Sequence, residues 1–328
     1  MRRRSRQWVA GFGVLGIIAV AATGAVGVPA LADPPPPSPV VAAVGDFACD
    51  PADSKYLGGL GTDVRCRQLA TSNALLSDAL VGSVLGLGDF QYDCGDPADW
   101  AVSYHPTWGR LGDRMVPVVG NHEYKTGTDA FGSSCPASNS TAAGYFSYFG
   151  SAAHPETAGH FSFDLGSWHL VGLNAQCTRS GAGGCTATSS QTTWLTQDLA
   201  TTTQPCVLAF WHQPLFTGLK SPNTAYRAWW SVLQSAHVDV VLNGHVHNYQ
   251  RYGPLLPDGT TSPDGITEYV VGTGGEAMAS LNAAANPQPL AYARTFGYLR
   301  LTLQPTGWMS EFVSSTGAVL DTSSGTCH

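Results

Sequence analysis

Five short, mainly apolar runs, each followed by a glycine or a polar residue, constrain the fold of this 328-residue chain more than any other feature. They span residues 40–44, 83–87, 115–119, 207–211 and 238–242, followed by Gly45-Asp46, Gly88-Asp89, Gly120-Asn121, His212 and Asn243-Gly244-His245. Short β-branched runs bounded by turn residues are typical of buried strands. We therefore expect strands that carry polar side chains at their carboxyl ends.

Segments with helical character lie between several of these strands. The sequence predicts helices over residues 65–79, 98–111, 190–201 and 224–236, and this alternation of strands and helices predicts an α/β fold. Further strand-like runs indicate a second sheet with antiparallel character. They span residues 159–165, 168–173, 267–271, 297–303 and 307–313.

The N-terminal residues 1–32 have the features of a secretory signal peptide. Four arginines precede an apolar or small-residue stretch over residues 8–28, and Ala30-Leu31-Ala32 resembles a cleavage site. An uncleaved membrane anchor is the alternative, because this stretch is long enough to span a bilayer. We expect cleavage, which predicts a secreted, extracytoplasmic protein without a stable membrane span.

The rest of the chain is interpreted as a Pro-rich spacer over residues 33–39 and one domain over residues 40–328. A hydrophobic fraction of 43% excludes global disorder and a multi-span membrane protein. Cleavage would reduce the 16 basic residues to 12 against 23 acidic ones, and the net charge would change from −7 to −11. That charge argues against nucleic acid as a partner, and we identify no nucleic-acid-binding module.

All eight cysteines follow the expected cleavage site, and an even number in an exported chain favours disulfides. Short separations favour Cys177–Cys185 and Cys49–Cys66, while Cys206–Cys327 would fix the C-terminus. Cys94 and Cys135 remain as the fourth pair. The alternative, zinc bound by cysteine, is disfavoured because the sequence has no Cys-x-x-Cys pair.

Eight polar residues at or near the strand ends form the candidate site. In α/β sheets, ligands collect at the carboxyl ends of strands, so residues far apart in sequence can converge there. Carboxylate, imidazole and amide ligands suit iron, manganese and zinc. Each residue alone is more often a turn residue or a structural histidine, but the whole set predicts a metal centre. The set is Asp46, Asp89, Tyr92, Asn121, His122, His212, His245 and His247.

The order of these residues resembles the five blocks of calcineurin-like metallophosphoesterases, and is most similar to the purple acid phosphatase branch and its bacterial secreted members. The resemblance implies a four-layer sandwich of two mixed β-sheets flanked by helices, with a dinuclear metal centre at one edge. The blocks are Gly45-Asp46, Gly88-Asp89-Phe90-Gln91-Tyr92, Gly120-Asn121-His122-Glu123, Trp211-His212 and Gly244-His245-Val246-His247.

The resemblance also implies a role for each site residue. Asp89 would bridge the two metal ions, and His122 would act as general acid on the leaving group. Glu123 would either orient His122 or be a plain surface acid. The remaining ligands are assigned as Asp46, Tyr92 and His247 at the first metal and Asn121, His212 and His245 at the second.

The first metal is expected to be Fe³⁺. Many metallophosphoesterases begin with Asp-x-His, but here Phe47 and Ala48 follow Asp46, so that imidazole is missing. Tyr92 would replace it, and a phenolate favours a trivalent ion; the alternative is a tyrosine packed at the edge of the site. The second ion would be divalent: Fe²⁺, Zn²⁺ or Mn²⁺.

The expected activity is hydrolysis of small phosphomonoesters by metal-bound hydroxide. The first alternative is a phosphodiesterase that acts on nucleotides or phospholipid headgroups, and the second is a non-catalytic protein that binds phosphate ligands. The sequence departs from related enzymes after His212, where Gln213 and Lys220 lie in a stretch that commonly contains further histidines. Lys220 would either contact phosphate or be a solvated loop residue.

Overall fold

The computed structural model describes residues 37–219 and 221–328. The expected signal peptide, residues 33–36 of the spacer and Lys220 lie outside the described residues. Within those residues, no helix combines the length and the apolar character that crossing a membrane requires.

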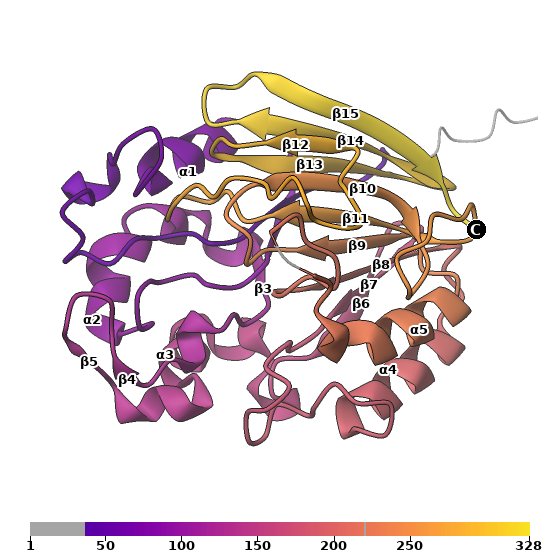
Figure 1. Ribbon diagram of the computed structural model, residues 1–328, viewed down its shortest axis with the longest axis horizontal. Coiled ribbons are helices and arrows are strands. Elements are labelled where there is room, and N and C mark those ends of the chain that lie inside the picture. The colour runs from indigo at the N-terminus through magenta and orange to yellow at the C-terminus, as the bar shows by residue number, and fades with distance from the viewer. Residues whose placement is uncertain (1–36, 220) are drawn as a thin grey trace, which may run out of the picture. The chain divides into compact units, whose positions relative to one another are not determined.

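The first sheet has six strands in the order β15-β14-β13-β1-β2-β3. Its C-terminal strands β13, β14 and β15 lie along the top of Figure 1. Its β1–β3 half is parallel, and its β13–β15 half is antiparallel. The polar residues that follow β1, β2 and β3 therefore lie at the same edge of this sheet. The strands are β1 (Val40–Val44), β2 (Ser83–Gly86), β3 (Met115–Pro117), β13 (Gly297–Gln304), β14 (Gly307–Ser314) and β15 (Val319–Thr326).

The second sheet has seven strands in the order β12-β10-β11-β9-β8-β7-β6. Strands β7, β8, β9 and β11 are parallel, while β6, β10 and β12 pair antiparallel with their neighbours. A separate two-stranded antiparallel ribbon consists of β4 (Gly127–Thr128) and β5 (Ser134–Cys135). The strands of the large sheet are β6 (Phe161–Leu165), β7 (Trp168–Gly172), β8 (Cys206–Trp211), β9 (Val240–Asn243), β10 (Tyr249–Leu255), β11 (Ile266–Val271) and β12 (Ala291–Ala293).

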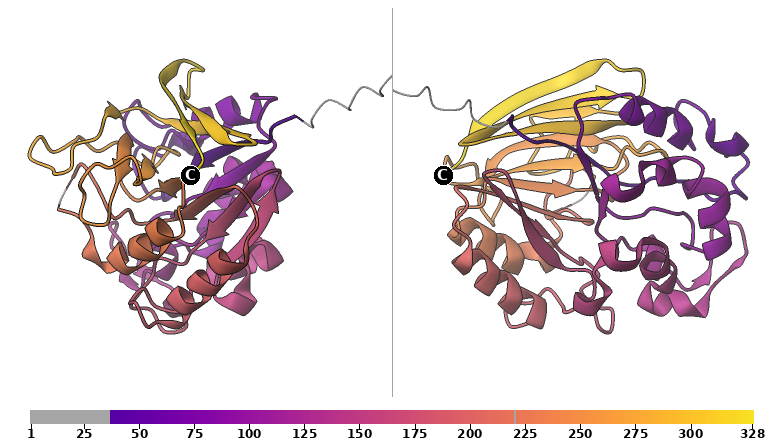
Figure 2. Two further views of the ribbon diagram at one scale, coloured as in Figure 1. Left: turned by 90° about the vertical axis from the view of Figure 1, so that its right-hand side faces the viewer. Right: turned by 180° about the vertical axis from the view of Figure 1, so that it is seen from behind.

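Three apolar cores separate four layers. One core lies between the two sheets, and Tyr249 of β10 stacks there on Phe312 of β14 with ring centroids 4.1 Å apart. A second core packs the first sheet against segments that include α1 (Gln68–Leu76) and α3 (Ala143–Phe149). The third packs the second sheet against α4 (Ser190–Thr201) and α5 (Arg227–Ser235). In the two views of Figure 2, the yellow C-terminal strands lie at the top, opposite the helices of the lower layer.

The α/β sandwich of mixed sheets agrees with the expected fold, but two details of the sequence-based prediction were wrong. The five strands that precede polar ends divide between the sheets, three in the first and two in the second. The single helix predicted over residues 98–111 is replaced by α2 (Pro97–Asp99) and two short irregular turns, Trp100–Tyr104 and Trp108–Arg114. Pro106 cannot continue a hydrogen-bonded helix, and Gly112 has a φ of 53°, which interrupts the second turn.

The four disulfides are the four pairs expected from the sequence: Cys49–Cys66, Cys94–Cys135, Cys177–Cys185 and Cys206–Cys327. Their Cα–Cα distances, 5.1–5.3 Å, lie within the range of ordinary disulfides. Cys206 begins β8 in the second sheet, and Cys327 directly follows β15 in the first. That bond therefore joins the two sheets covalently.

Candidate active site

The carboxyl ends of five strands meet along the seam between the two sheets and bring the predicted site residues together. The first sheet contributes the loops after β1, β2 and β3, and the second contributes those after β8 and β9. The site is thus built by both sheets. The eight residues that these loops carry are Asp46, Asp89, Tyr92, Asn121, His122, His212, His245 and His247.

Asp46, Tyr92 and His247 form the first cluster of donors. The Tyr92 hydroxyl lies 2.7 Å from Asp46 Oδ1 and 3.1 Å from His247 Nε2. His247 Nε2 is in turn 3.1 Å from Asp46 Oδ1. Asp46 is completely buried, and its second oxygen, Oδ2, accepts a hydrogen bond from the backbone N–H of His245 at 2.7 Å. Three potential ligand atoms therefore point at one small volume.

Asn121, His212 and His245 form the second cluster together with Asp89. His212 Nε2 lies 3.0 Å from Asp89 Oδ2, 3.1 Å from Asn121 Oδ1 and 3.2 Å from His245 Nδ1. His212 Nδ1 donates to the Leu87 carbonyl at 2.7 Å, which leaves Nε2 directed at the cluster. Nitrogen and oxygen atoms of Asp89, His212 and His245 converge closely enough to hold a metal ion.

Asp89 connects the two clusters. Its Oδ2 is 2.9 Å from the Tyr92 hydroxyl of the first cluster and 3.0 Å from His212 Nε2 of the second. Its Oδ1 accepts a hydrogen bond from the backbone N–H of His122 at 2.8 Å. A carboxylate in this place is suited to bridge two cations.

The charges of the site suit cations. Burial lowers the pKa of His247, but the negative charges of Asp46 and Glu276 outweigh this effect and raise the pKa to about 10. Burial likewise lowers the pKa of His212, but the charge of Asp89 outweighs it and raises the pKa to about 9. Burial raises the pKa of the Tyr92 phenol well above its usual value, and the nearby carboxylates raise it further. A phenolate at this position therefore requires strong positive charge beside it, which metal ions provide. The donor set and its surroundings fit a dinuclear centre.

The backbone of the site is held in an unfavourable conformation at three of these residues. Asp46, Asp89 and His245 have φ angles of 61°, 54° and 68°, in the left-handed region. Such conformations cost about 1–3 kcal/mol each and persist where the surroundings enforce them.

Gly120 shows how closely the loops pack, because a Cβ there would lie 2.2 Å from the Asp89 backbone nitrogen.

His122 lies beside the two clusters rather than within them. Its Nε2 is 4.0 Å from Asp89 Oδ2, while its Nδ1 donates to the Asp93 carbonyl at 2.6 Å and lies 3.0 Å from Asp93 Oδ1. The Asp93 carboxylate is itself held by Lys125 Nζ at 2.6 Å and by the Ala130 N–H at 2.7 Å. Burial lowers the pKa of His122, but Asp89 and Asp93 outweigh this effect and raise it.

Neither interpretation of Glu123 was right. The side chain is buried, and its carboxylate accepts hydrogen bonds from the backbone N–H groups of Gly120 at 2.8 Å, Phe90 at 2.7 Å and Asp89 at 3.1 Å. Burial, followed by the charge of Asp89, raises its pKa to about 7. Glu123 thus fixes the loops after β2 and β3, and Asp93 occupies the place beside His122.

Two residues at the site, Asp93 and Glu276, were missed by the sequence analysis. Glu276 Oε2 lies 3.1 Å from His247 Nδ1. Its sequence signal is its position after Gly274-Gly275, at the end of a strand-like run similar to the others. Asp93 has no such signal, because it simply follows Tyr92.

A pocket of about 270 Å³ opens beside His245. Its described lining, apart from His245, is uncharged and consists of Pro214, Thr217, Leu219, Ser221, Asn223 and Val246. Gln213, where the sequence departs from related enzymes, lies nearby, and its Nε2 is 3.4 Å from Asn121 Oδ1. The second cluster therefore borders a cavity of mixed polarity.

A family model described as calcineurin-like phosphoesterase matches residues 41–249, a range that contains all eight predicted site residues. The chain belongs to the calcineurin-like phosphoesterase family. This result confirms the resemblance inferred from the five sequence blocks.

The curated relatives of this family member include several purple acid phosphatases. It is 28% identical to purple acid phosphatase 15 of Arabidopsis thaliana over 61% of this chain and 39% of the relative. It is 29% identical to acid phosphatase A of Cryphonectria parasitica over 50% of this chain and 38% of the relative. The matches thus span about two fifths of the length of these curated relatives.

Solved structures show the same fold at lower identity. A purple acid phosphatase from yellow lupin (Lupinus luteus) seeds has a TM-score of 0.64 and 17% identity, with 88% of this chain and 53% of that chain covered. GAP50, described as the anchor in the inner membrane complex of Plasmodium, has a TM-score of 0.58 and 14% identity, with 89% and 90% covered. These similarities confirm the metallophosphoesterase fold.

Proposed function

We propose that this calcineurin-like phosphoesterase hydrolyses phosphomonoesters at a centre of two metal ions. The observation that carries the proposal is the convergence of two donor clusters on Asp89 at the seam between the two sheets. The His122 imidazole lies just outside these clusters, and a pocket opens beside them. The curated purple acid phosphatase relatives support the proposal.

The two clusters are assigned as the two metal sites. Asp46, Tyr92 and His247 would hold the first ion, and Asp89 would bridge to the second, held by Asn121, His212 and His245. When bound, two such ions neutralise phosphate oxygens and lower the pKa of water, which makes a nucleophile available near neutral pH. The buried carboxylates of Asp46 and Asp89 are suited to hold these ions, because little solvent competes for them.

His122 would transfer a proton to the departing alcohol oxygen. Asp93 binds the Nδ1–H side of the ring, so the other nitrogen, Nε2, is free to face the substrate. The raised pKa of His122 favours the protonated form that a general acid needs. Lys125 and the Ala130 N–H fix the Asp93 carboxylate and thereby the orientation of the ring.

The pocket beside His245 would receive the organic part of the substrate. A monoester carries one organic group, and a cavity of about 270 Å³ lined by Pro214, Thr217 and Leu219 is suited to one such group. A diester would have to place a second group outside it. This difference favours monoesters over the diesters of the alternative assignment.

The reconstituted protein is expected to hydrolyse p-nitrophenyl phosphate with a kcat/KM at least ~10-fold higher than that for bis(p-nitrophenyl) phosphate, about 1.4 kcal/mol in activation free energy. Steady-state assays with both esters at equal metal content test this. A preference for the bis-ester would assign a phosphodiesterase. Absence of hydrolysis of either ester by a chain that holds two metals would instead assign a phosphate-binding protein.

Fe³⁺ is proposed at the first site because Tyr92 is an anionic oxygen donor once deprotonated, and such donors favour hard, highly charged ions. The partner ion would be Fe²⁺, Zn²⁺ or Mn²⁺. We expect a broad visible absorption band from the iron–phenolate pair, which Tyr92→Phe should abolish while the fold is retained. Tyr124→Phe is the matched control, because that buried hydroxyl accepts from Asn174 outside the clusters. A colourless, fully active protein that contains zinc or manganese without iron would refute this assignment.

Export is also proposed, with residues 1–32 removed as a signal peptide and a single phosphoesterase domain over residues 40–328. Four disulfides support it, because such bonds persist in oxidising compartments and are rare in reducing ones.

A further inference from the structure

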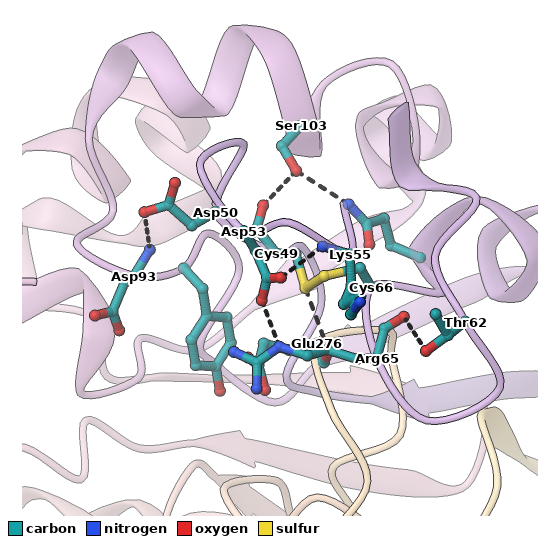
Figure 3. Close-up of a disulfide and its surroundings, with 12 residues drawn as sticks. Cys49, Asp50, Asp53, Lys55, Thr62, Arg65, Cys66, Asp93, Ser103 and Glu276 are labelled. Atoms are coloured by element: carbon teal, nitrogen blue, oxygen red, sulfur yellow. Dashed lines mark hydrogen bonds and ion pairs between the residues drawn. A yellow bond between two sulfur atoms is a disulfide. The ribbon is translucent and has the colours of Figure 1, made fainter. Parts of the chain in front are cut away.

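The loop over residues 50–65 is closed by the Cys49–Cys66 disulfide at the border of the site (Figure 3). Both cysteines are buried. Ser103 Oγ fixes the start of the loop by donating to the Cys49 carbonyl at 2.6 Å. The position of the end of the loop, and hence of Arg65, is therefore tightly defined.

The end of the loop is also attached to the segment that follows β11. The backbone N–H of Cys66 donates to the Glu276 carbonyl at 2.8 Å, and the Met278 N–H donates to the Val64 carbonyl at 2.9 Å. Arg65 and Ala277 form an antiparallel bridge between these bonds. Two segments more than 200 positions apart in the sequence thus lie side by side and carry Arg65 and Glu276.

The side chains continue this connection toward the first cluster. The Arg65 guanidinium contacts the Asp53 carboxylate through Nε and lies 3.2 Å from Glu276 Oε1 through a terminal nitrogen (Figure 3). The other oxygen of Glu276, Oε2, is 3.1 Å from His247 Nδ1. The two oxygens of one buried carboxylate therefore have separate partners, one cation and one imidazole.

The contact on Nδ1 decides what His247 can do through its other nitrogen. A histidine that donates its Nδ1–H to a carboxylate keeps Nε2 available as a metal ligand, and the carboxylate fixes the plane of the ring. His247 Nε2 is the atom that lies 3.1 Å from both Asp46 Oδ1 and the Tyr92 hydroxyl. Glu276 is thus placed to orient His247, and Arg65 is placed to orient Glu276.

We propose that Arg65 and Glu276 are positioning residues that hold His247 for the first metal ion. The proposal rests on the proposed function, because it requires a metal in the first cluster. Asp53 and the Cys49–Cys66 disulfide serve the same end, since they fix Arg65. The consequence is that a loop that supplies none of the proposed metal ligands sets the affinity of one of the two metal sites.

Metal affinity, measured separately for the two ions, tests this proposal. Glu276→Ala is expected to lower the affinity for one of the two ions about 10–100-fold, the usual effect of removing a residue that orients a metal ligand. Arg65→Ala is expected to weaken the same ion to a smaller extent. Arg67→Ala is the matched control, because Arg67 is two positions away and pairs with the exposed Asp63 at 3.6 Å. The measurement is metal content after dialysis against graded chelator concentrations.

Glu276→Gln keeps the shape and one acceptor for the His247 Nδ1–H, so it should retain more affinity than Glu276→Ala. In the Glu276→Gln background, Arg65→Ala should add little, because the two residues act in one chain. If Arg65→Ala fails to fold, the comparison of Glu276→Gln with Glu276→Ala still tests whether Glu276 positions His247.

The outcomes separate this proposal from the proposed function. A wild-type chain that takes up no metal would overturn the function itself. A wild-type chain with two metals, whose affinities respond equally to Arg65→Ala and Arg67→Ala, would overturn only the positioning role. Equal weakening of both ions in Glu276→Ala would also overturn it, because that pattern indicates general destabilisation.

Discussion

Asp89→Ala is expected to remove both metal ions and to reduce phosphoester hydrolysis to the detection limit. One oxygen of this carboxylate, Oδ2, lies within 3.0 Å of both the Tyr92 hydroxyl and His212 Nε2, so its loss opens both clusters at once. Without cations, the pKa of water returns from about 7 toward about 15.7, and hardly any hydroxide remains at neutral pH. Metal analysis and an assay with p-nitrophenyl phosphate measure the two effects.

Asp78→Ala is the matched control for that experiment. Asp78 is also a shielded carboxylate, and it pairs with Arg300 at 2.6 Å and accepts from the Tyr298 hydroxyl at 2.9 Å, away from the site. We expect a loss of stability there with both metals retained. Two metals per chain at wild-type affinity in Asp89→Ala would refute the bridging role.

His122→Ala is expected to lower turnover about 10²–10⁴-fold on esters with poor leaving groups, the range for loss of a general acid. Both metals should remain, since His122 Nε2 lies 4.0 Å from Asp89 Oδ2 and the ring is not part of either donor cluster. The loss should be smaller for p-nitrophenyl phosphate, because p-nitrophenolate departs with little help from a proton. Rates for alkyl and aryl phosphates, with metal content measured in parallel, check these expectations.

His105→Ala provides the comparison, because His105 is an exposed histidine that contacts the Tyr148 hydroxyl at 2.8 Å. It should keep wild-type rates on every ester. If His122→Ala slowed good and poor leaving groups equally, the general-acid assignment would be wrong.

Much of the fold could be predicted because local signals and burial agree. Helix α4 (Ser190–Thr201) was predicted with its observed bounds. The strands that precede the site residues were found because most of their residues are apolar. Strand β15 (Val319–Thr326) was missed because it lies at a sheet edge with alternate side chains exposed and includes the polar run Asp321-Thr322-Ser323-Ser324. The division of the parallel strands between two sheets depends on pairing with β11 and β13, which local patterns do not contain.

The candidate site divides in the same way. The eight predicted residues carry a signal of their own, a polar side chain at or near the end of an apolar strand. Asp93 and Glu276 act through partners, His122 and His247, whose proximity exists only in the folded chain. Glu123 was misjudged because its partners are backbone N–H groups, which every residue possesses and no sequence pattern marks.

The location of the site at the seam links metal supply to the lifetime of the folded chain. Cys206, bonded to Cys327, begins β8, whereas His212 directly follows the last residue of the same strand. One fixed bond therefore fastens the sheets at the start of β8, and the proposed metal ions would fasten them at its end, reversibly. Ions at 100 times their dissociation constant stabilise a folded state by about 2.7 kcal/mol. Metal starvation would then lower the amount of folded protein as well as the rate at which each molecule hydrolyses its substrate.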